Sequence, residues 1–228
     1  MTTIPGNLQH VRARIATACQ RAGRGVEEVT LLAVSKTFGA DAVRAAAAAG
    51  QRAFGENYIQ EGVEKIAALR DLGLMWHCIG PIQSNKTRLV AEHFDWVHTV
   101  DRLKIAERLS AQRPADRPPL NVCIQVNIDG GANKSGVAPG EALALARAVA
   151  ALPQLKLRGL MSIPEIAPDF EAARAVHASA RALFDQLNAD GLGLDTLSMG
   201  MSDDLEAAIA AGSTTVRIGT AIFGSRAP

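Results

Sequence analysis

One lysine of this sequence ends a run of apolar and small residues. Lys36 follows residues 31–35, which read LLAVS, and such a run is typical of a buried strand. Burial lowers the pKa of a lysine amine and makes its neutral, nucleophilic form accessible. Lys36 is therefore a candidate for a covalent bond to a carbonyl compound. The alternative is a lysine that extends from a strand end into solvent.

Two segments in the last part of the chain are candidates for binding a phosphate group. Residues 198–204 read SMGMSDD, and residues 216–220 read VRIGT. Glycines let a phosphate approach backbone amides, and hydroxyl groups add further donors. Ser202, Gly219 and Thr220 are therefore candidate phosphate ligands. Ser202 is also a candidate helix N-cap, a role that is compatible with phosphate binding.

Two further polar residues are candidates for contacts with a cofactor ring. Arg217 lies within an apolar strand, and buried arginines are rare unless they are paired. An arginine stays charged and cannot readily supply a proton. Beside the ring nitrogen of a cofactor, it would leave that nitrogen unprotonated and the ring a weak electron sink. Such an arrangement disfavours carbanion chemistry. The alternative for Arg217 is a structural ion pair. Asn57 follows Gly55-Glu56 and is a candidate either to flank the ring or to cap the next helix.

The elements that must position these residues alternate along the chain. Strand-like runs occur at residues 31–36, 52–55, 75–80, 96–100, 122–128, 157–163, 196–199 and 215–219. Segments with helical spacing lie between them, and another precedes them at 8–22. This order predicts an α/β fold, a single (β/α)8 TIM barrel over residues 1–228 with an extra N-terminal helix. An open doubly wound sheet is the competitor, but residues 35–38 are not its usual glycine-rich turn.

A closed parallel barrel brings the candidate residues together. Its first strand lies beside the eighth, and its sites lie where strands end. Lys36 is therefore expected close to both phosphate-binding segments. A reactive amine beside a phosphate suits pyridoxal 5'-phosphate (PLP) or the substrate of a Schiff-base aldolase. The aldolase hypothesis leaves Arg217 unexplained and gives Lys36 no acid–base partner.

Composition excludes several other classes of protein. The formal net charge is +1, so we expect no nucleic acid and no membrane surface as partner. Apolar runs are far shorter than the roughly 18 residues of a membrane span, and the N-terminus is unlike a secretory signal. The three cysteines and five histidines show no metal-ligand spacing, so no metal and a cytoplasmic location are predicted. Lys86 and Lys134 are interpreted as solvated charges, with a second PLP site as the alternative, and His98 is interpreted as a residue at the barrel rim.

Several blocks of the sequence together resemble the pyridoxal phosphate homeostasis protein family, whose members are alanine-racemase-like barrels. The resemblance runs nearly from end to end, although residues 162–169 are more individual. The blocks that carry it are residues 34–36, 55–58, 79–86, 134–136, 199–204 and 217–220.

The resemblance implies a PLP fold-type-III barrel with the cofactor on Lys36. It implies phosphate contacts from Ser202, Gly219 and Thr220, with Arg217 facing the pyridine nitrogen. It further implies a monomer that helps to balance PLP and amino-acid pools without robust catalytic turnover. PLP-dependent apoenzymes are the protein partners that this role suggests.

Two hypotheses about function are compared on this basis. In the first, the chain is a carrier that holds PLP as a Schiff base. In the second, it is an amino-acid racemase of the alanine racemase type. Such a racemase resembles a barrel followed by a β-domain that supplies a tyrosine base, whereas this chain ends at Pro228 and its one tyrosine is Tyr58. Together with Arg217, this favours the carrier.

Overall fold

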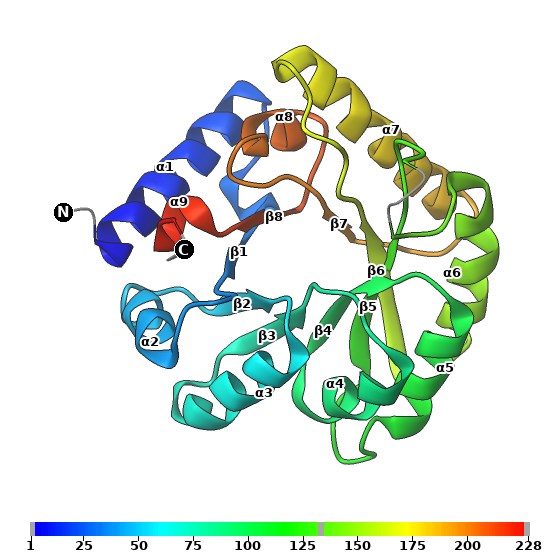
Figure 1. Ribbon diagram of the computed structural model, residues 1–228. Helices are drawn as coiled ribbons and strands as arrows, with labels where there is room; N and C mark the ends of the chain where they lie inside the picture. The colour runs from blue at the N-terminus through cyan, green and yellow to red at the C-terminus, as the bar shows by residue number, and fades with distance from the viewer. Residues whose placement is uncertain (1–2, 132–134, 226–228) are drawn as a thin grey trace.

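Eight parallel strands close into a barrel in the computed structural model, which describes residues 3–131 and 135–225. Each strand pairs with the next along the chain, and β1 closes the ring against β8 (Figure 1). The strands are β1 Thr30–Val34, β2 Ala53–Glu56, β3 Met75–Cys78, β4 Trp96–Val100, β5 Leu120–Gln125, β6 Leu155–Met161, β7 Thr196–Ser198 and β8 Thr215–Ile218. The TIM barrel expected from the sequence is confirmed.

Helices surround the barrel, and one follows each strand (Figure 1). They are α1 Ile4–Arg21, α2 Ala40–Ala48, α3 Ile59–Ala68, α4 Thr87–His93, α5 Leu103–Gln112, α6 Ala142–Ala150, α7 Phe170–Ala189, α8 Leu205–Ala210 and α9 Thr220–Phe223. Short 3-10 helices cover Val26–Glu28, Arg70–Leu72, Ser84–Lys86 and Pro139–Glu141. Among the helices of the described residues, none combines the length and apolar character needed to cross a membrane.

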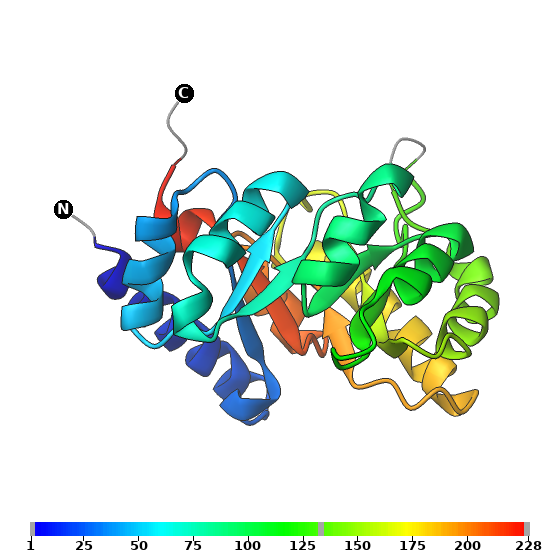
Figure 2. The ribbon, with the colours of Figure 1, turned by 90° about the horizontal axis from the view of Figure 1, so that it is seen from below.

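Helices α1 and α9 bring the two ends of the described chain together. Asn7 Nδ2 donates to the Ile222 carbonyl at 2.8 Å, and Figures 1 and 2 both draw the two ends on the same side.

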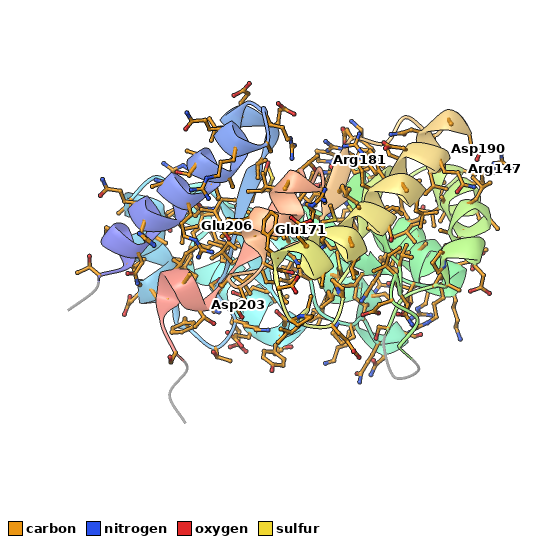
Figure 3. The ribbon with its side chains drawn as sticks, turned by 90° about the horizontal axis from the view of Figure 1, so that it is seen from above. Arg147, Glu171, Arg181, Asp190, Asp203 and Glu206 are labelled. Atoms are coloured by element: carbon orange, nitrogen blue, oxygen red, sulfur yellow. The ribbon has the colours of Figure 1, made fainter. Side chains whose placement is uncertain are left out.

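At the opposite side, Figure 3 shows Arg147 beside Asp190. The two side chains form an ion pair of 3.3 Å that links α6 to the end of α7. The helical layer is therefore closed around the barrel by polar contacts as well as by apolar packing.

The strands separate two layers of apolar side chains. Because successive strand residues point to opposite faces, outward residues such as Ala33 and Phe54 pack with the helices in one large buried cluster. Leu32, Val34 and Ile79 form a second, small cluster that faces the barrel interior. Polar side chains are buried there as well, among them His77, His98 and Arg217.

Some boundaries differ from those expected from the sequence. The first helix begins at Ile4, before the expected 8–22, because Thr3 Oγ1 accepts from the Gly6 amide at 3.3 Å and Pro5 occupies the first turn. Both features are start signals for helices. Strands β5 and β6 each begin two residues earlier than expected. Strand β1 ends at Val34, so Lys36 lies in the turn beyond it.

Gly159 marks the closest backbone approach in the barrel wall, and its replacement by alanine is expected to destabilise the fold. A Cβ at this β6 position would lie 1.6 Å from the Thr196 carbonyl oxygen of β7, so the two strands would have to separate. Overpacking of this kind lowers the free energy of unfolding by about 3 kcal/mol. Urea unfolding measures the change. Gly140→Ala is the control, because nothing lies within 4 Å of its added Cβ. Equal stability of the two variants would contradict the prediction.

Candidate functional site

A cavity of about 290 Å³ opens at the end of the barrel where the strands terminate. Its wall includes all six residues that the sequence analysis selected for a cofactor: Lys36, Asn57, Ser202, Arg217, Gly219 and Thr220. They come from the ends of β1, β2, β7 and β8 and from the loops beyond. The closure of β1 against β8 therefore brings together positions that lie almost 200 residues apart in the chain.

Lys36 reaches this cavity from the first turn after β1. The amide of Ser35 still donates to the Gly55 carbonyl at 3.1 Å, and the amide of Phe38 closes a turn onto the Ser35 carbonyl at 3.1 Å. Lys36 is half-buried between these two bonds. Lys36 therefore belongs to the wall of the cavity.

The segment before α8 is fixed from two sides. Arg14 of α1 donates to the Ser202 carbonyl at 3.0 Å and forms an ion pair with Glu206 at 2.8 Å. Asp204 Oδ1 accepts from the Met201 amide at 2.6 Å, and Asp204 Oδ2 lies 2.8 Å from His177 Nε2. Figure 3 labels Glu206 on α8. These contacts hold the Ser202 segment against the cavity.

The interpretation of Ser202 as a helix N-cap is wrong. Helix α8 begins at Leu205, and its N-cap position is occupied by Asp204. Burial alone would raise the pKa of Asp204, but hydrogen bonds from His177 and the Met201 amide outweigh it and hold that pKa below its usual range. Ser202 lines the cavity instead of capping the helix.

Gly219 and Thr220 form the wall next to β1. Gly219 follows β8 at the N-cap position of the short helix α9, which Thr220 begins. A Cβ at Gly219 would lie 3.3 Å from the Val34 carbonyl oxygen, tighter than most side chains accept, so glycine allows a close approach here. Thr220 is exposed and lines the cavity, so its hydroxyl is a candidate donor to a group entering the cavity.

Arg217 is held by hydrogen bonds inside the barrel. Its Nη1 donates to Ser198 Oγ at 2.8 Å, and its Nη2 donates to the Ser162 carbonyl at 2.9 Å. Burial lowers the pKa of Arg217 to about 10, so the guanidinium remains charged at neutral pH. The structural ion pair considered for Arg217 is absent from the interactions of the described residues, where neutral oxygens accept both bonds.

Two buried histidines extend this network through the barrel. His98 Nδ1 lies 2.9 Å from Ser198 Oγ, and His98 Nε2 lies 2.9 Å from His77 Nδ1. His77 stacks on Trp96, with ring centroids 5.2 Å apart. The prediction that His98 lies at the rim is wrong, because the side chain is fully buried in the interior.

Burial keeps both histidines neutral. It lowers the pKa of His77 to about 3. It also lowers the pKa of His98 well below its usual value, with His77 and Arg217 acting in the same direction. One hydrogen-bonded chain runs from Arg217 through the Ser198 hydroxyl and His98 to His77. At its end, His77 Nε2 is buried without a hydrogen-bond partner among the described residues.

Asn57 presents an unused hydrogen-bonding atom at the cavity. It lines the wall, and its Oδ1 is buried without a partner among the described residues. The N-cap position of α3 belongs to Tyr58 and not to Asn57. A buried acceptor without a partner is costly, so a donor supplied by a bound molecule would stabilise it.

The cavity wall also has an apolar part, which was not predicted from the sequence. Val34 and Ile79 come from the small inner cluster, Ile163 follows β6, and Phe38 stacks on Phe223 with centroids 5.2 Å apart. Ile163 lies in the 162–169 stretch, from which the resemblance carried nothing over. These side chains give a bound ring an apolar surface, and their only signal in the sequence is a position next to a strand end.

The other candidates lie elsewhere. Lys86 ends a 3-10 helix before α4 and does not line the cavity. Lys134 lies outside the described residues. No group of three or more His, Cys, Asp or Glu side chains in residues 3–131 and 135–225 is arranged to hold a metal ion.

The residues present fit PLP. The wall offers a primary amine, hydroxyl donors beside a glycine backbone, and a buried guanidinium. Apolar side chains and the unused Asn57 acceptor complete it. These groups complement an aldehyde, a phosphate and a flat ring that carries polar substituents. The positive charge of Arg217 favours an anionic ligand.

Comparison with known proteins agrees with this fit. A family model described as the N-terminal domain of alanine racemase matches residues 6–227. The pyridoxal phosphate homeostasis protein of Pseudomonas aeruginosa is 64% identical over 226 residues, which cover 99% of this chain and 97% of the relative. That of Escherichia coli K12 is 58% identical over 233 residues, covering 99% and 98%.

Solved structures resemble the barrel as a whole. PipY of Synechococcus elongatus, determined without PLP, has a TM-score of 0.86 and 39% identity, and the match covers 97% of this chain and 100% of PipY. PipY with PLP bound has a TM-score of 0.80 and 39% identity over 92% of this chain and 100% of PipY. Alanine racemase from Corynebacterium glutamicum, at 21% identity and a TM-score of 0.65, shares the fold over 97% of this chain and 62% of its own.

Proposed function

The chain belongs to the pyridoxal phosphate homeostasis protein family, and we propose that it binds PLP as a Schiff base on Lys36 and contributes to intracellular PLP and amino-acid homeostasis. One observation carries the assignment of the site. Lys36, Arg217 and Ser202 line one cavity. Residues 1–228 then form a single PLP-binding domain.

Each residue of the wall has a distinct role in this proposal. Bound PLP supplies an electrophilic aldehyde that condenses with amines. Lys36 supplies the amine and holds the cofactor covalently. Ser202, Gly219 and Thr220 bind the phosphate through hydroxyl and backbone donors. Arg217 donates toward the ring nitrogen, and Asn57 accepts at the ring edge through the Oδ1 atom that otherwise lacks a partner.

The arrangement supports binding without robust catalytic turnover. Arg217 remains charged with a pKa of about 10, so it does not protonate a ring nitrogen and leaves the ring a weak electron sink. Tyr58, the one tyrosine of the chain, is 54% exposed and lies outside the cavity wall. The second base that a racemase requires is therefore not supplied by this tyrosine.

The cellular part of the proposal follows from the family. We infer a monomeric, cytoplasmic protein whose partners are PLP and PLP-dependent apoenzymes. The open cavity at the barrel mouth supports exchange of a small ligand with solvent or with another protein. Direct transfer would appear as activation of a purified apoenzyme by the PLP-loaded chain at a rate that exceeds release of PLP into solution.

An absorbance spectrum before and after borohydride treatment, followed by peptide mass mapping, tests the assignment. The PLP-loaded protein should show a visible Schiff-base band, which borohydride removes while fixing one cofactor on the peptide that contains Lys36. If no band forms even after PLP is added, the proposal is wrong. The Schiff-base aldolase hypothesis would then account best for Lys36 beside a phosphate site.

Replacing Ser202 by alanine should weaken retention of PLP without unfolding the protein. A hydrogen bond to a charged phosphate contributes about 1.5–3 kcal/mol, so the dissociation constant should rise roughly ten- to a hundredfold. Equilibrium titration of the apoprotein with PLP measures the change. Ser179→Ala, on the exposed face of α7, is the matched control. Unchanged affinity in Ser202→Ala would remove Ser202 from the phosphate site.

A further inference from the structure

We propose that Glu56, Glu61 and Lys65 are positioning residues that orient Lys36 by holding the backbone on both sides of it. The inference rests on the proposed function, in which Lys36 carries PLP. The three side chains, called here the Lys65 cluster, do not line the cavity. They lie behind the turn that follows β1 and act on Lys36 through its two neighbours, Ser35 and Thr37.

Lys65 binds the residue that precedes Lys36. From α3, its Nζ donates to the Ser35 carbonyl at 2.7 Å, to Glu56 Oε1 at 2.8 Å and to Glu61 Oε1 at 2.5 Å. An ammonium group has three N–H donors, so all of them are used. Ser35 is also held through its side chain, because its Oγ donates to Glu56 Oε1 at 2.6 Å.

Glu61 binds the residue that follows Lys36. The same Oε1 atom accepts from the Thr37 amide at 2.7 Å. Thr37 has φ 69° and is the one non-glycine residue with positive φ among the described residues. A β-branched residue in this conformation is strained, so it persists only where the surroundings hold it. Glu61 supplies that hold one residue beyond the reactive amine.

The cluster is buried enough to be rigid. The side chains of Glu56 and Lys65 are 0% and 6% exposed, and that of Glu61 is 29% exposed. Burial raises the pKa of Glu56, and hydrogen bonds from Lys65 and Ser35 oppose this rise. Removing one member of such a buried group is strongly unfavourable. The contacts to Ser35 and Thr37 are therefore fixed, and ordinary strand pairing does not provide them.

Orientation matters because Lys36 must present its amine to an aldehyde whose phosphate is bound across the cavity. Reaction between held partners depends steeply on their geometry, and a displacement of about 1 Å lowers rates roughly a hundredfold. A cluster that only stabilised the packing of α3 would affect folding and leave this reaction unchanged. The two roles are therefore separable by experiment.

Glu61→Ala is the variant that tests the proposal. Lys65→Met is less suitable, because it would leave two carboxylates without their cation. Glu61→Ala removes a partly exposed side chain from a helix, where alanine is well tolerated. Its removal takes away the acceptor of the Thr37 amide. Glu61→Gln restores a neutral acceptor of the same shape. Glu64→Ala, on the same helix and exposed, is the matched control.

Three measurements are made on each purified chain: the melting temperature of the apoprotein, the rate at which added PLP forms the borohydride-reducible adduct on Lys36, and the rate of reductive methylation of Lys36 by formaldehyde. Glu61→Ala should slow adduct formation roughly tenfold and leave the methylation rate as in Glu64→Ala. Glu61→Gln should return most of the adduct rate. Formaldehyde is small and needs no fixed orientation, so the methylation rate measures the intrinsic reactivity of the Lys36 amine.

The outcomes separate this inference from the proposed function. Wild-type protein that forms no adduct on Lys36 would overturn the proposed function itself. Wild-type protein that reacts, with Glu61→Ala as fast as Glu64→Ala, would overturn the positioning role alone. Equal slowing of PLP attachment and methylation would also overturn it, because the cluster would then act on the ionisation of the amine and not on its direction.

Discussion

Replacing Lys36 by alanine is expected to abolish the borohydride-stable attachment of PLP completely. Lys36 is the one lysine in the cavity wall of the described residues, so no other amine there can take over the bond. The proposed phosphate donors at Ser202, Gly219 and Thr220 are unchanged in this variant. The variant should therefore keep a weaker, reversible complex, which equilibrium dialysis detects after the visible Schiff-base band has been lost.

Lys86→Ala is the matched control for this experiment, because Lys86 also follows a strand end but does not line the cavity. It should take up one reducible PLP per chain, as the wild type does. A Lys36→Ala chain that still forms an adduct at full stoichiometry would contradict the assignment. Peptide mapping would then identify the lysine that carries PLP, and Lys86 and Lys134 would be the first to examine.

The sequence was sufficient to predict the barrel and the residues around its mouth. Alternating apolar runs determined the eight strands, and closure of a parallel barrel determined that the first lies beside the eighth. That neighbour relation, seen in the pairing of Leu32 with Arg217, makes Lys36 and Gly219 part of one wall. The prediction used only the order of the elements, which short-range patterns reveal well.

The sequence was not sufficient to predict which polar groups meet inside the fold. His98 bonds to Ser198 across 100 residues, and Lys65 bonds to Ser35 across 30. Such partners depend on the stagger of strands and on the rotation of each helix, and residue spacing gives neither. His98 was therefore interpreted as a rim residue, although its position inside an apolar strand indicates burial with a partner.

The same limit explains the error at Ser202. A serine followed by two aspartates before a helix is a common capping pattern. Here Asp204 instead uses its carboxylate for the Met201 amide and for His177 of α7. The helix therefore begins later, at Leu205. The Ser202 segment is held by this local contact to Met201 and by long-range contacts from Arg14 and His177, and residue spacing does not reveal the long-range ones.

Mild acid is expected to destabilise the apoprotein strongly, because two histidines are buried in neutral form. In an unfolded chain a histidine binds a proton below about pH 6.5. In the folded protein burial lowers the pKa of His77 to about 3, and that of His98 is also well below its usual value. The unfolded state therefore binds more protons across this window, so stability falls as the pH falls.

His77 should remove about 2 kcal/mol from the free energy of unfolding between pH 7 and pH 5, and His98 acts in the same direction. The raised pKa of Glu56 acts in the opposite direction, because the folded state then takes up its proton first, and this partly offsets the loss at the acid end. Urea unfolding of the apoprotein at pH 7, 6 and 5 measures the slope directly.

His77→Gln should reduce this slope, because glutamine has no proton to gain in this range and its carbonyl can still accept from His98 Nε2. His10→Gln, on the exposed face of α1, should keep the wild-type slope. If the slope of His77→Gln equals that of the wild type, proton uptake by His77 on unfolding does not drive the loss. A steep slope that His77→Gln reduces would instead show that the polar chain behind Arg217 is held neutral at the expense of stability in acid.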